Sequence, residues 1–243
     1  MRLTVLGCGD AFGSGGRFNT SFYLALNDGR RIALDFGATS MVALHREGID
    51  PDSLDAIIIS HLHGDHFGGV PFLILYLQFK AERDRPLTIA GPPGVGERVA
   101  EATRVFFGGA KGPWRFEINI VEITPGRIHE VAGLAVEAFP VVHGNVTSQA
   151  LRLDDGARVL AFSGDTSWTD VLLEVARDAD LFIMECYAIE GPCATHTDWP
   201  TLSAHLPEIT AKRVLLTHLN PTMLAHRHDV GLDTLHDGMV IDV

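Results

Sequence analysis

The order of apolar and polar positions along the chain predicts short strands alternating with helices. Eleven strand-like runs, β-branched or alternating in polarity, cover Leu3–Leu6, Ser21–Leu26, Arg31–Leu34, Ala56–Ser60, Leu87–Ala90, Phe116–Val121, Leu134–Phe139, Ser148–Leu153, Arg158–Phe162, Leu181–Met184 and Arg213–Thr217. Helical segments are predicted over Thr39–Glu47, Phe67–Glu82, Gly94–Phe107, Thr169–Arg177, Thr201–Thr210 and Pro221–Ala225. Along the second helix, Phe67, Phe72, Tyr76 and Phe79 form a stripe expected to lie mostly in the core.

The predicted elements fall into two similar halves. Asn27-Asp28-Gly29 and Asp154-Asp155-Gly156 each lie between two strand runs and predict hairpin turns, each followed by strand, helix, strand and helix. This order predicts an α/β fold with helices on both outer faces of the layers. No Pro- or Ser-rich linker separates the halves, so residues 1–243 are expected to form a single domain. The glycine-rich stretch 108–113 is interpreted as a loop, with a substrate lid as the alternative.

Composition narrows the class of protein. With 46% apolar residues and 21% charged residues, the 243-residue chain can bury a large core, which excludes a disordered protein. The net charge, 19 − 31 = −12, argues against an extended nucleic-acid-binding surface. Three cysteines cannot all pair, no signal peptide precedes the first strand, and the longest apolar run, Val70–Leu77, is too short to span a membrane. We therefore expect a soluble cytoplasmic protein without a membrane partner.

The strongest chemical signal is the segment His61-Leu62-His63-Gly64-Asp65-His66, which directly follows a predicted buried strand. In an extended segment, residues two apart project to the same side, so His61 and His63 can bind one ion together. Gly64 permits a turn, after which Asp65 and His66 project from the start of the next helix. Imidazole and carboxylate ligands suit Zn²⁺, with Mn or Fe as alternatives. The alternative, a polar turn with surface histidines, does not explain four ligand-type side chains in six residues.

Three further candidate ligands follow predicted strands: His143, Asp165 and His218. Loops at the carboxyl ends of strands converge in α/β folds, so these residues can join the histidine-rich motif. Each has an ordinary alternative when taken alone. A single histidine after a strand is more often not a ligand, and Asp165 can instead be a helix N-cap.

Taken together, these motifs resemble those of the metallo-β-lactamase fold hydrolases. The resemblance rests on His-Leu-His-Gly-Asp-His at 61–66, a distant His143, Ser163-Gly164-Asp165-Thr166 and Leu216-Thr217-His218, and it covers essentially the whole chain. It implies a four-layer αβ/βα sandwich with two divalent metal ions at one edge of two facing sheets. It also implies that His61, His63 and His143 bind one ion, that Asp65, His66 and His218 bind the other, and that Asp165 bridges both.

Within this superfamily the chain is most similar to ribonuclease Z and the small phosphodiesterases. Gly7-Cys8-Gly9-Asp10, Arg17-Phe18-Asn19-Thr20-Ser21, Leu34-Asp35-Phe36-Gly37 and Gly91-Pro92-Pro93 match the style of that branch, and His196 lies where the branch carries a histidine facing the scissile phosphate. Two departures argue against tRNA 3′-processing. Residues 144–164, between His143 and Asp165, leave no room for a long tRNA-binding arm, and Met184-Glu185-Cys186-Tyr187 replaces the usual His-Glu-Ala-Thr.

The resemblance therefore favours a phosphodiesterase acting on small or cyclic phosphodiesters. A hydroxide bridging the two ions would attack phosphorus, His196 would act as general acid or stabilise charge on the leaving alkoxide, and Asp65 would help to orient the hydroxide. His196 can alternatively be an exposed loop residue, with Asp198 capping the next helix. Asp35 can fix a ligand histidine or be a simple turn residue.

Several other functions stay open. Hydrolysis of a thioester, lactone or lactam would use the same ions but would not need His196. Dimetal redox chemistry is disfavoured because such relatives usually replace His63 with a carboxylate, and a metal- or nucleotide-sensing module would bind without turnover. Relatives of this kind are often homodimers, and the sequence does not fix the oligomeric state.

The triplet His226-Arg227-His228 either extends the site near His218 or forms a solvated turn.

Overall fold

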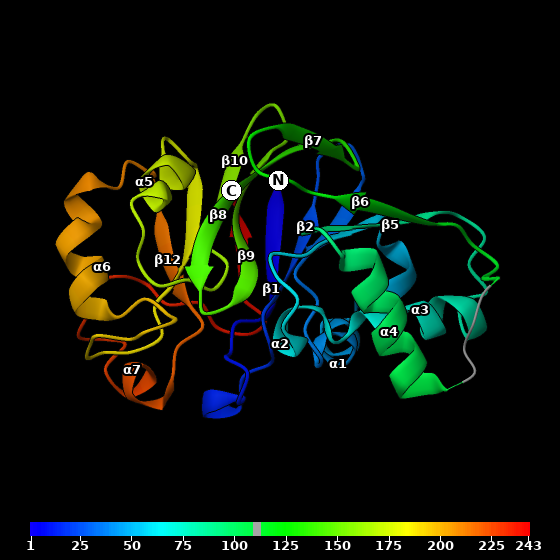
Figure 1. Cartoon of the computed structure of the whole chain (residues 1–243), viewed down its shortest axis with the longest axis horizontal. Helices are drawn as coiled ribbons and strands as arrows, with labels where there is room; N and C mark the ends of the chain where they lie inside the picture. Colours follow the sequence, from blue (N-terminus) through cyan, green and yellow to red (C-terminus); the bar gives the residue numbers. More distant parts are fainter. Residues whose placement is uncertain (109–112) are drawn as a thin grey trace.

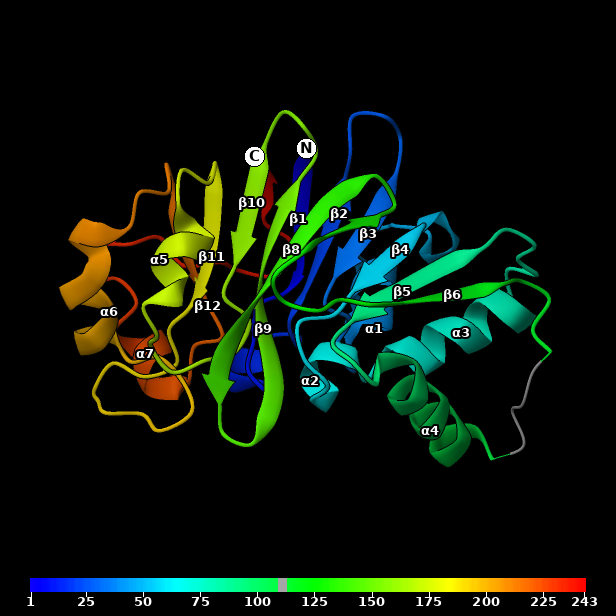
Figure 2. The same ribbon diagram turned by 45° about the horizontal axis from the view of Figure 1, so that its top comes forward.

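Two β-sheets face each other at the centre of the molecule, and helices cover the outer face of each, as Figure 1 and Figure 2 show. The computed structural model describes residues 1–108 and 113–243. Most of the glycine-rich stretch expected to be a loop or a lid, namely 109–112, lies outside the described residues. Among the described helices, none is long and apolar enough to cross a membrane.

The first sheet carries the N-terminal half of the chain. Its strands, in spatial order, are β13 (Val240–Asp242), β1 (Arg2–Gly7), β2 (Ser21–Ala25), β3 (Arg31–Leu34), β4 (Ala56–Ile58), β5 (Leu87–Gly91) and β6 (Ile118–Glu122). The pairings from β13 to β3 are antiparallel, and those from β3 to β6 are parallel. Four helices cover its outer face: α1 (Ser40–Arg46), α2 (Gly64–Phe67), α3 (Val70–Phe79) and α4 (Val95–Phe107).

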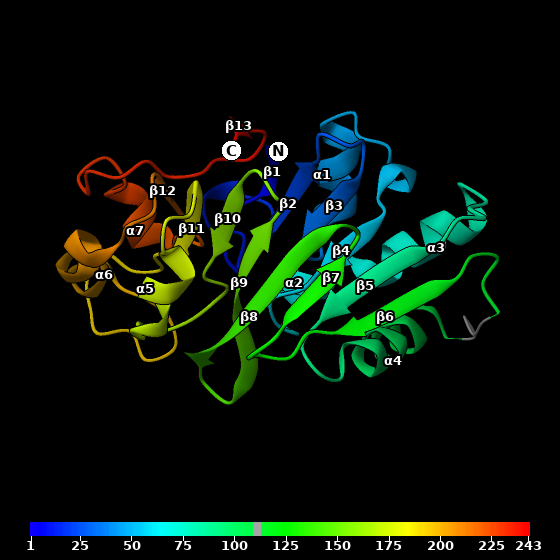
Figure 3. The same cartoon turned by 90° about the horizontal axis from the view of Figure 1, so that it is seen from above.

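The second sheet repeats this plan. Its strands, in spatial order, are β12 (Val214–Thr217), β11 (Leu181–Glu185), β10 (Val159–Phe162), β9 (Val146–Asp154), β8 (Leu134–His143) and β7 (Ile128–Val131). Pairings from β7 to β10 are antiparallel, and those from β10 to β12 are parallel. Helices α5 (Val171–Ala176), α6 (Trp199–His205) and α7 (Pro221–Ala225) cover its outer face, at the left of the molecule in Figure 3. Short 3₁₀ helices η1 (Ser14–Gly16), η2 (Pro51–Ser53) and η3 (Leu206–Glu208) complete the fold.

Strands with both faces buried explain the continuous apolar runs in the sequence. Along β4, Ala56 and Ile58 face the opposite sheet, whereas Ile57 packs under the helices of the first half. At the centre of the inter-sheet core, the rings of Phe22 and Phe162 meet edge to face with centroids 5.6 Å apart. The predicted four-layer αβ/βα sandwich is therefore confirmed, as are the two hairpin turns and the likeness of the two halves.

The predicted helix over 67–82 is wrong at its start, because the chain breaks at Gly68–Gly69 between α2 and α3. Gly69 donates its N–H to the carbonyl of Phe36, and a Cβ at Gly69 would lie 2.4 Å from the carbonyl oxygen of Gly37. This close approach to the end of β3 requires glycine and ends α2 after one turn. The aromatic stripe is also partly wrong: Phe72 is 44% exposed and Phe79 is 70% exposed.

Two strands had no clear signal in the sequence. The β7 strand is a four-residue edge strand in a hairpin with β8, and β13 pairs with β1 from the opposite end of the chain. Both depend on partners that are already in place, so neither is visible from its own residues.

Candidate metal centre

The seven candidate ligands converge at the edge of the two sheets where the parallel strands end. His61 and His63 follow β4, and His63 directly precedes α2, which carries Asp65 and His66. From the second sheet, His143 is the last residue of β8, Asp165 follows β10, and His218 follows β12. The sequence folds this way because ends of neighbouring parallel strands meet at one edge, so loops from both halves reach a common point.

His61, His63 and His143 form the first cluster. The Nε2 atoms of His61 and His143 each lie 3.1 Å from Nδ1 of His63. Burial is the main cause that lowers the pKa of each of these imidazoles, so all three are neutral near pH 7 and offer lone pairs. Three neutral ring nitrogens aimed at one point are the donor set for one soft or borderline cation.

Asp65, His66, Asp165 and His218 form the second cluster. The Nε2 atom of His66 lies 3.4 Å from Oδ2 of Asp65 and 3.3 Å from Oδ2 of Asp165, and Nε2 of His218 has the same two distances. Burial is the largest single influence on the pKa of His66 and of His218 and lowers it, but the surrounding carboxylates, Asp165 first among them, together outweigh burial and raise the pKa of both. The carboxylates of Asp65 and Asp165 therefore favour positive charge in this cluster, which either protons on the histidines or a bound cation can supply.

The Asp165 carboxylate lies between the two clusters. Besides its contacts to His66 and His218, its Oδ2 atom is 3.8 Å from Nε2 of His61 and 3.9 Å from Nε2 of His143. Asp165 is 2% exposed, and its side chain makes none of the contacts of an N-cap to α5. The helix-cap alternative is therefore wrong for this residue.

Buried hydrogen bonds hold the histidine rings from behind. The Nδ1 atom of His66 lies 2.6 Å from Oδ2 of Asp35, whose carboxylate also accepts from Ser60 N at 2.7 Å and Ser60 Oγ at 2.8 Å. His143 Nδ1 donates to the carbonyl of Thr195 at 2.7 Å. Asp35 and His218 both adopt left-handed backbone angles, φ 54° and φ 60°, a strain that is common at functional sites. Asp35 is thus a positioning group for a histidine, the first of its two sequence interpretations.

His196 lies beside the clusters in a cleft of about 310 Å³. Its side chain is 16% exposed, so the exposed-loop alternative is wrong, although Asp198 does cap α6 by accepting from the N–H of Thr201. The ring stacks on Tyr187 with centroids 4.6 Å apart, and Nδ1 lies 3.1 Å from Oε2 of Glu185.

Neither Glu185 nor Tyr187 has a role that was predicted from the sequence. Glu185 is fully buried at the end of β11, where burial, followed by the nearby Asp165 carboxylate, raises its pKa well above the usual range. In the sequence, Glu185 directly follows the predicted apolar strand Leu181–Met184. Asp165 and His218 became candidates because they too follow predicted strands, so the same signal was available for Glu185. The triplet at 226–228 does not extend the site, because none of its residues lines the cleft.

Comparison with known proteins agrees with this geometry. The profile of the family described as "Anti-Pycsar protein Apyc1" matches residues 1–237. A protein of that name from Bacillus phage 010DV004 is 28% identical over 236 residues, covering 92% of this chain and 90% of its own. Ribonuclease Z from Geobacillus kaustophilus is 27% identical over 276 residues, covering 90% and 88%. The crystal structure of the metallo-β-lactamase fold protein YhfI from Bacillus subtilis superposes with a TM-score of 0.80 at 21% identity, covering 99% and 98%.

Proposed function

The chain belongs to the anti-Pycsar protein Apyc1 family within the metallo-β-lactamase fold, and from this premise we propose that it is a metal-dependent phosphodiesterase acting on small or cyclic phosphodiesters. The observation that carries the proposal is the Asp165 carboxylate, which lies within 3.9 Å of imidazole nitrogens from both clusters. A carboxylate in this position can bridge two cations.

The donor set fits two divalent ions. Around a tetrahedral Zn²⁺ with Zn–N bonds of about 2.0–2.1 Å, ligand atoms are separated by roughly 3.3 Å, close to the 3.1 Å and 3.3–3.4 Å separations found in the two clusters. Within residues 1–108 and 113–243, the buried Nε2 atom of His66 has no hydrogen-bond partner, as expected of a ligand atom. His61, His63 and His143 would hold one ion, Asp65, His66 and His218 the other, and Asp165 both. Zn²⁺ fits best, with Mn or Fe as alternatives.

When bound, such ions lower the pKa of a coordinated water towards about 7 and neutralise phosphoryl oxygens. The remaining tasks fall to the protein. Asp65 offers a carboxylate that can orient the attacking water, and His196 faces the cleft where the leaving oxygen would lie. Burial raises the pKa of Glu185 and lowers the pKa of His196, so a protonated Glu185 can donate to Nδ1 of a neutral His196 ring. The ring then carries its own proton on Nε2, facing the leaving alkoxide, and Glu185 can replace that proton through Nδ1. Burial of Glu185 fixes the orientation of that ring.

The size of the cleft favours a small substrate. At about 310 Å³ it is near the lower end for small-molecule sites, and Phe12 and Tyr187 contribute aromatic walls. The segment between His143 and Asp165 consists of β9, β10 and short connecting turns, so it contains no additional tRNA-binding arm. The similarity to ribonuclease Z keeps tRNA 3′-processing as a second candidate, which the acidic charge of −12 argues against.

The deciding experiment is steady-state hydrolysis of bis-p-nitrophenyl phosphate by protein loaded with Zn²⁺ or Mn²⁺. His196→Ala should lower turnover about 100-fold, as for the loss of an acid catalyst, without changing the metal content. His205→Ala is the matched control, because His205 lies outside the cleft, stacked on Trp168. A panel of cyclic nucleotides, a pre-tRNA, a thioester and a lactone then compares substrate classes. Absence of diester turnover in protein that holds two ions would overturn the proposal and direct the search to the thioester and lactone.

A further inference from the structure

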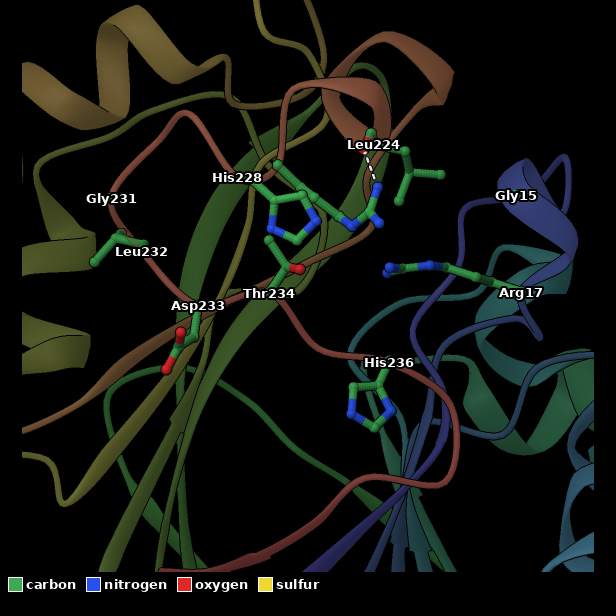
Figure 4. Close-up of a pocket in the computed structure, with 10 residues that line it drawn as sticks. Gly15, Arg17, Leu224, His228, Gly231, Leu232, Asp233, Thr234 and His236 are labelled. Carbon is green, nitrogen blue, oxygen red and sulfur yellow. Dashed lines mark hydrogen bonds between the residues drawn. The ribbon is translucent and has the colours of Figure 1, made fainter.

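A second cavity, of about 690 Å³, lies apart from the two clusters of candidate metal ligands, and Figure 4 shows the residues that line it. None of the seven candidate ligands lines it. Its walls come from the start of the chain, from α7 and from the segment that follows α7. The residues lining it are Gly15, Arg17, Leu224, Arg227, His228, Gly231, Leu232, Asp233, Thr234 and His236. Arg17 reaches into the cavity from the N-terminal side, facing the segment that carries His228 and His236.

Arg17 and Arg227 are both incompletely neutralised. Arg17 Nη1 donates to the carbonyl of Leu235 at 2.8 Å, and Arg227 Nη1 donates to the carbonyl of Leu224 at 2.7 Å. Within the described parts of the chain, no carboxylate oxygen lies within 4.0 Å of either guanidinium group. Each guanidinium has five N–H donors, so most of the donors on both groups stay available to a ligand.

The rest of the lining adds to this positive character. Asp233 is the one acidic residue among the lining residues, and its side chain is 79% exposed and lies 4.0 Å from Arg213. His228 and His236 contribute two more nitrogen-bearing rings. The chain has a net charge of −12, whereas this cavity is lined by two arginines and one aspartate, so its local charge is positive.

We propose that this cavity is a binding site for the phosphate group of a small phosphomonoester. A monoester carries about −1.5 to −2 charges at pH 7 and three acceptor oxygens, which matches two guanidinium forks better than a singly charged diester does. The volume exceeds the needs of a bare phosphate ion and lies in the range of small-molecule sites. Leu224 and Leu232 offer apolar surface, and Thr234 a hydroxyl, to the organic part of the ligand.

A short segment near the start of the chain runs from the cleft beside the candidate ligands to this cavity. Asp10, Ala11 and Phe12 line the cleft, whereas Gly15 and Arg17, a few residues later, line the cavity. The carboxylate of Asp10 holds this segment by accepting from the N–H of Ser14 at 2.9 Å and from its hydroxyl at 2.6 Å. A ligand bound at Arg17 would therefore contact the same segment that lines the cleft at Asp10, Ala11 and Phe12.

Isothermal titration calorimetry of the metal-loaded protein tests the site without relying on turnover. The probes are phenylphosphonate, which mimics a monoester but has no ester bond, and inorganic phosphate. Arg227→Gln should weaken phenylphosphonate binding about tenfold or more, as for the loss of a charge-assisted contact. Arg98→Gln is the matched control, because Arg98 lies on the exposed face of α4 beside Glu101. His63→Ala, which disrupts the metal-type cluster, should retain binding.

Each outcome decides the assignment. Tighter binding of phenylphosphonate than of phosphate supports a monoester site, whereas equal affinities overturn the organic part of the proposal in favour of a simple phosphate site. Binding that is lost in His63→Ala and kept in Arg227→Gln places the anion at the metal centre and overturns the site. If Arg227→Gln does not fold, His228→Asp, on an exposed side chain, replaces it and should weaken binding by adding a negative charge to the cavity.

Discussion

The substitution Asp35→Asn tests whether the carboxylate behind His66 prepares that ring to bind a cation. Asn tolerates the left-handed backbone at position 35, so the change is confined to the side-chain atoms. If the amide oxygen keeps the hydrogen bond from Ser60 N, the amide N–H₂ replaces Oδ2 and faces Nδ1 of His66. Two donors then oppose each other, and the imidazole must accept at Nδ1 and carry its proton on Nε2.

The cost can be estimated from the structure. A proton on Nε2 removes the lone pair that faces Asp65 and Asp165, and loss of a group orienting a metal ligand typically weakens metal affinity by about 10- to 100-fold, or ~1.4–2.7 kcal/mol. Competition with a chromophoric chelator measures that affinity directly. We expect weaker binding of the ion at Asp65, His66 and His218. The affinity for the ion at His61, His63 and His143 should be unchanged.

Asp237→Asn is the matched control. The Asp237 carboxylate accepts from the backbone N–H groups of Cys8 and Phe18 and contacts none of the candidate ligands. It should lower the melting temperature with no effect on metal affinity. Equal affinities in wild type and Asp35→Asn, or an equal loss in Asp237→Asn, would refute the assignment of Asp35 as a positioning residue.

Three further predictions concern stability and reactivity. Phe162→Ala should cost about 3–5 kcal/mol of unfolding free energy in urea titrations, because it opens a cavity between the sheets, and a cost under 1 kcal/mol would contradict the packing. Hydrogen bonds from Lys212 and from the N–H of Val159 hold the pKa of Asp180 below its usual range, so Asp180→Asn should cost about 1 kcal/mol at pH 7. That difference should shrink as the pH falls below about 4, where the unfolded chain takes up the proton, and a constant difference would contradict it. Iodoacetamide should label Cys193 in the native protein and spare Cys8 and Cys186, whose pKa values burial raises; peptide mass spectrometry reads the result, and modification of Cys8 would contradict it.

Sequence and structure agree best where the chemistry is local. Four ligand-type side chains lie within His61–His66, so this part of the candidate site could be predicted from a six-residue segment alone. His143, Asp165 and His218 needed the additional rule that the carboxyl ends of strands meet at one edge. The apolar alternation along each strand was enough to predict the layered fold, because both faces of both sheets are buried.

What the sequence could not predict depends on contacts between distant segments. The choice between a positioning role and a turn role for Asp35 is decided by His66, 31 residues away. The early end of α2 depends on the approach of Gly69 to Gly37. The second cavity is lined by both Arg17 and Arg227. These two residues lie near opposite ends of the chain, so no local sequence pattern predicts that they share a cavity.

The two halves of the molecule meet at the candidate metal centre, and this has a consequence for folding. His63 and His143 are 80 residues apart in the sequence, and Asp65 and His218 are 153 residues apart. An ion shared by such a pair closes a long loop in the same way as a covalent cross-link, for which chain entropy alone gives about 4–5 kcal/mol at these lengths. Metal affinity and cohesion of the sheet interface are then thermodynamically linked, so a cavity at Phe162 should weaken metal binding, and chelation should loosen the interface.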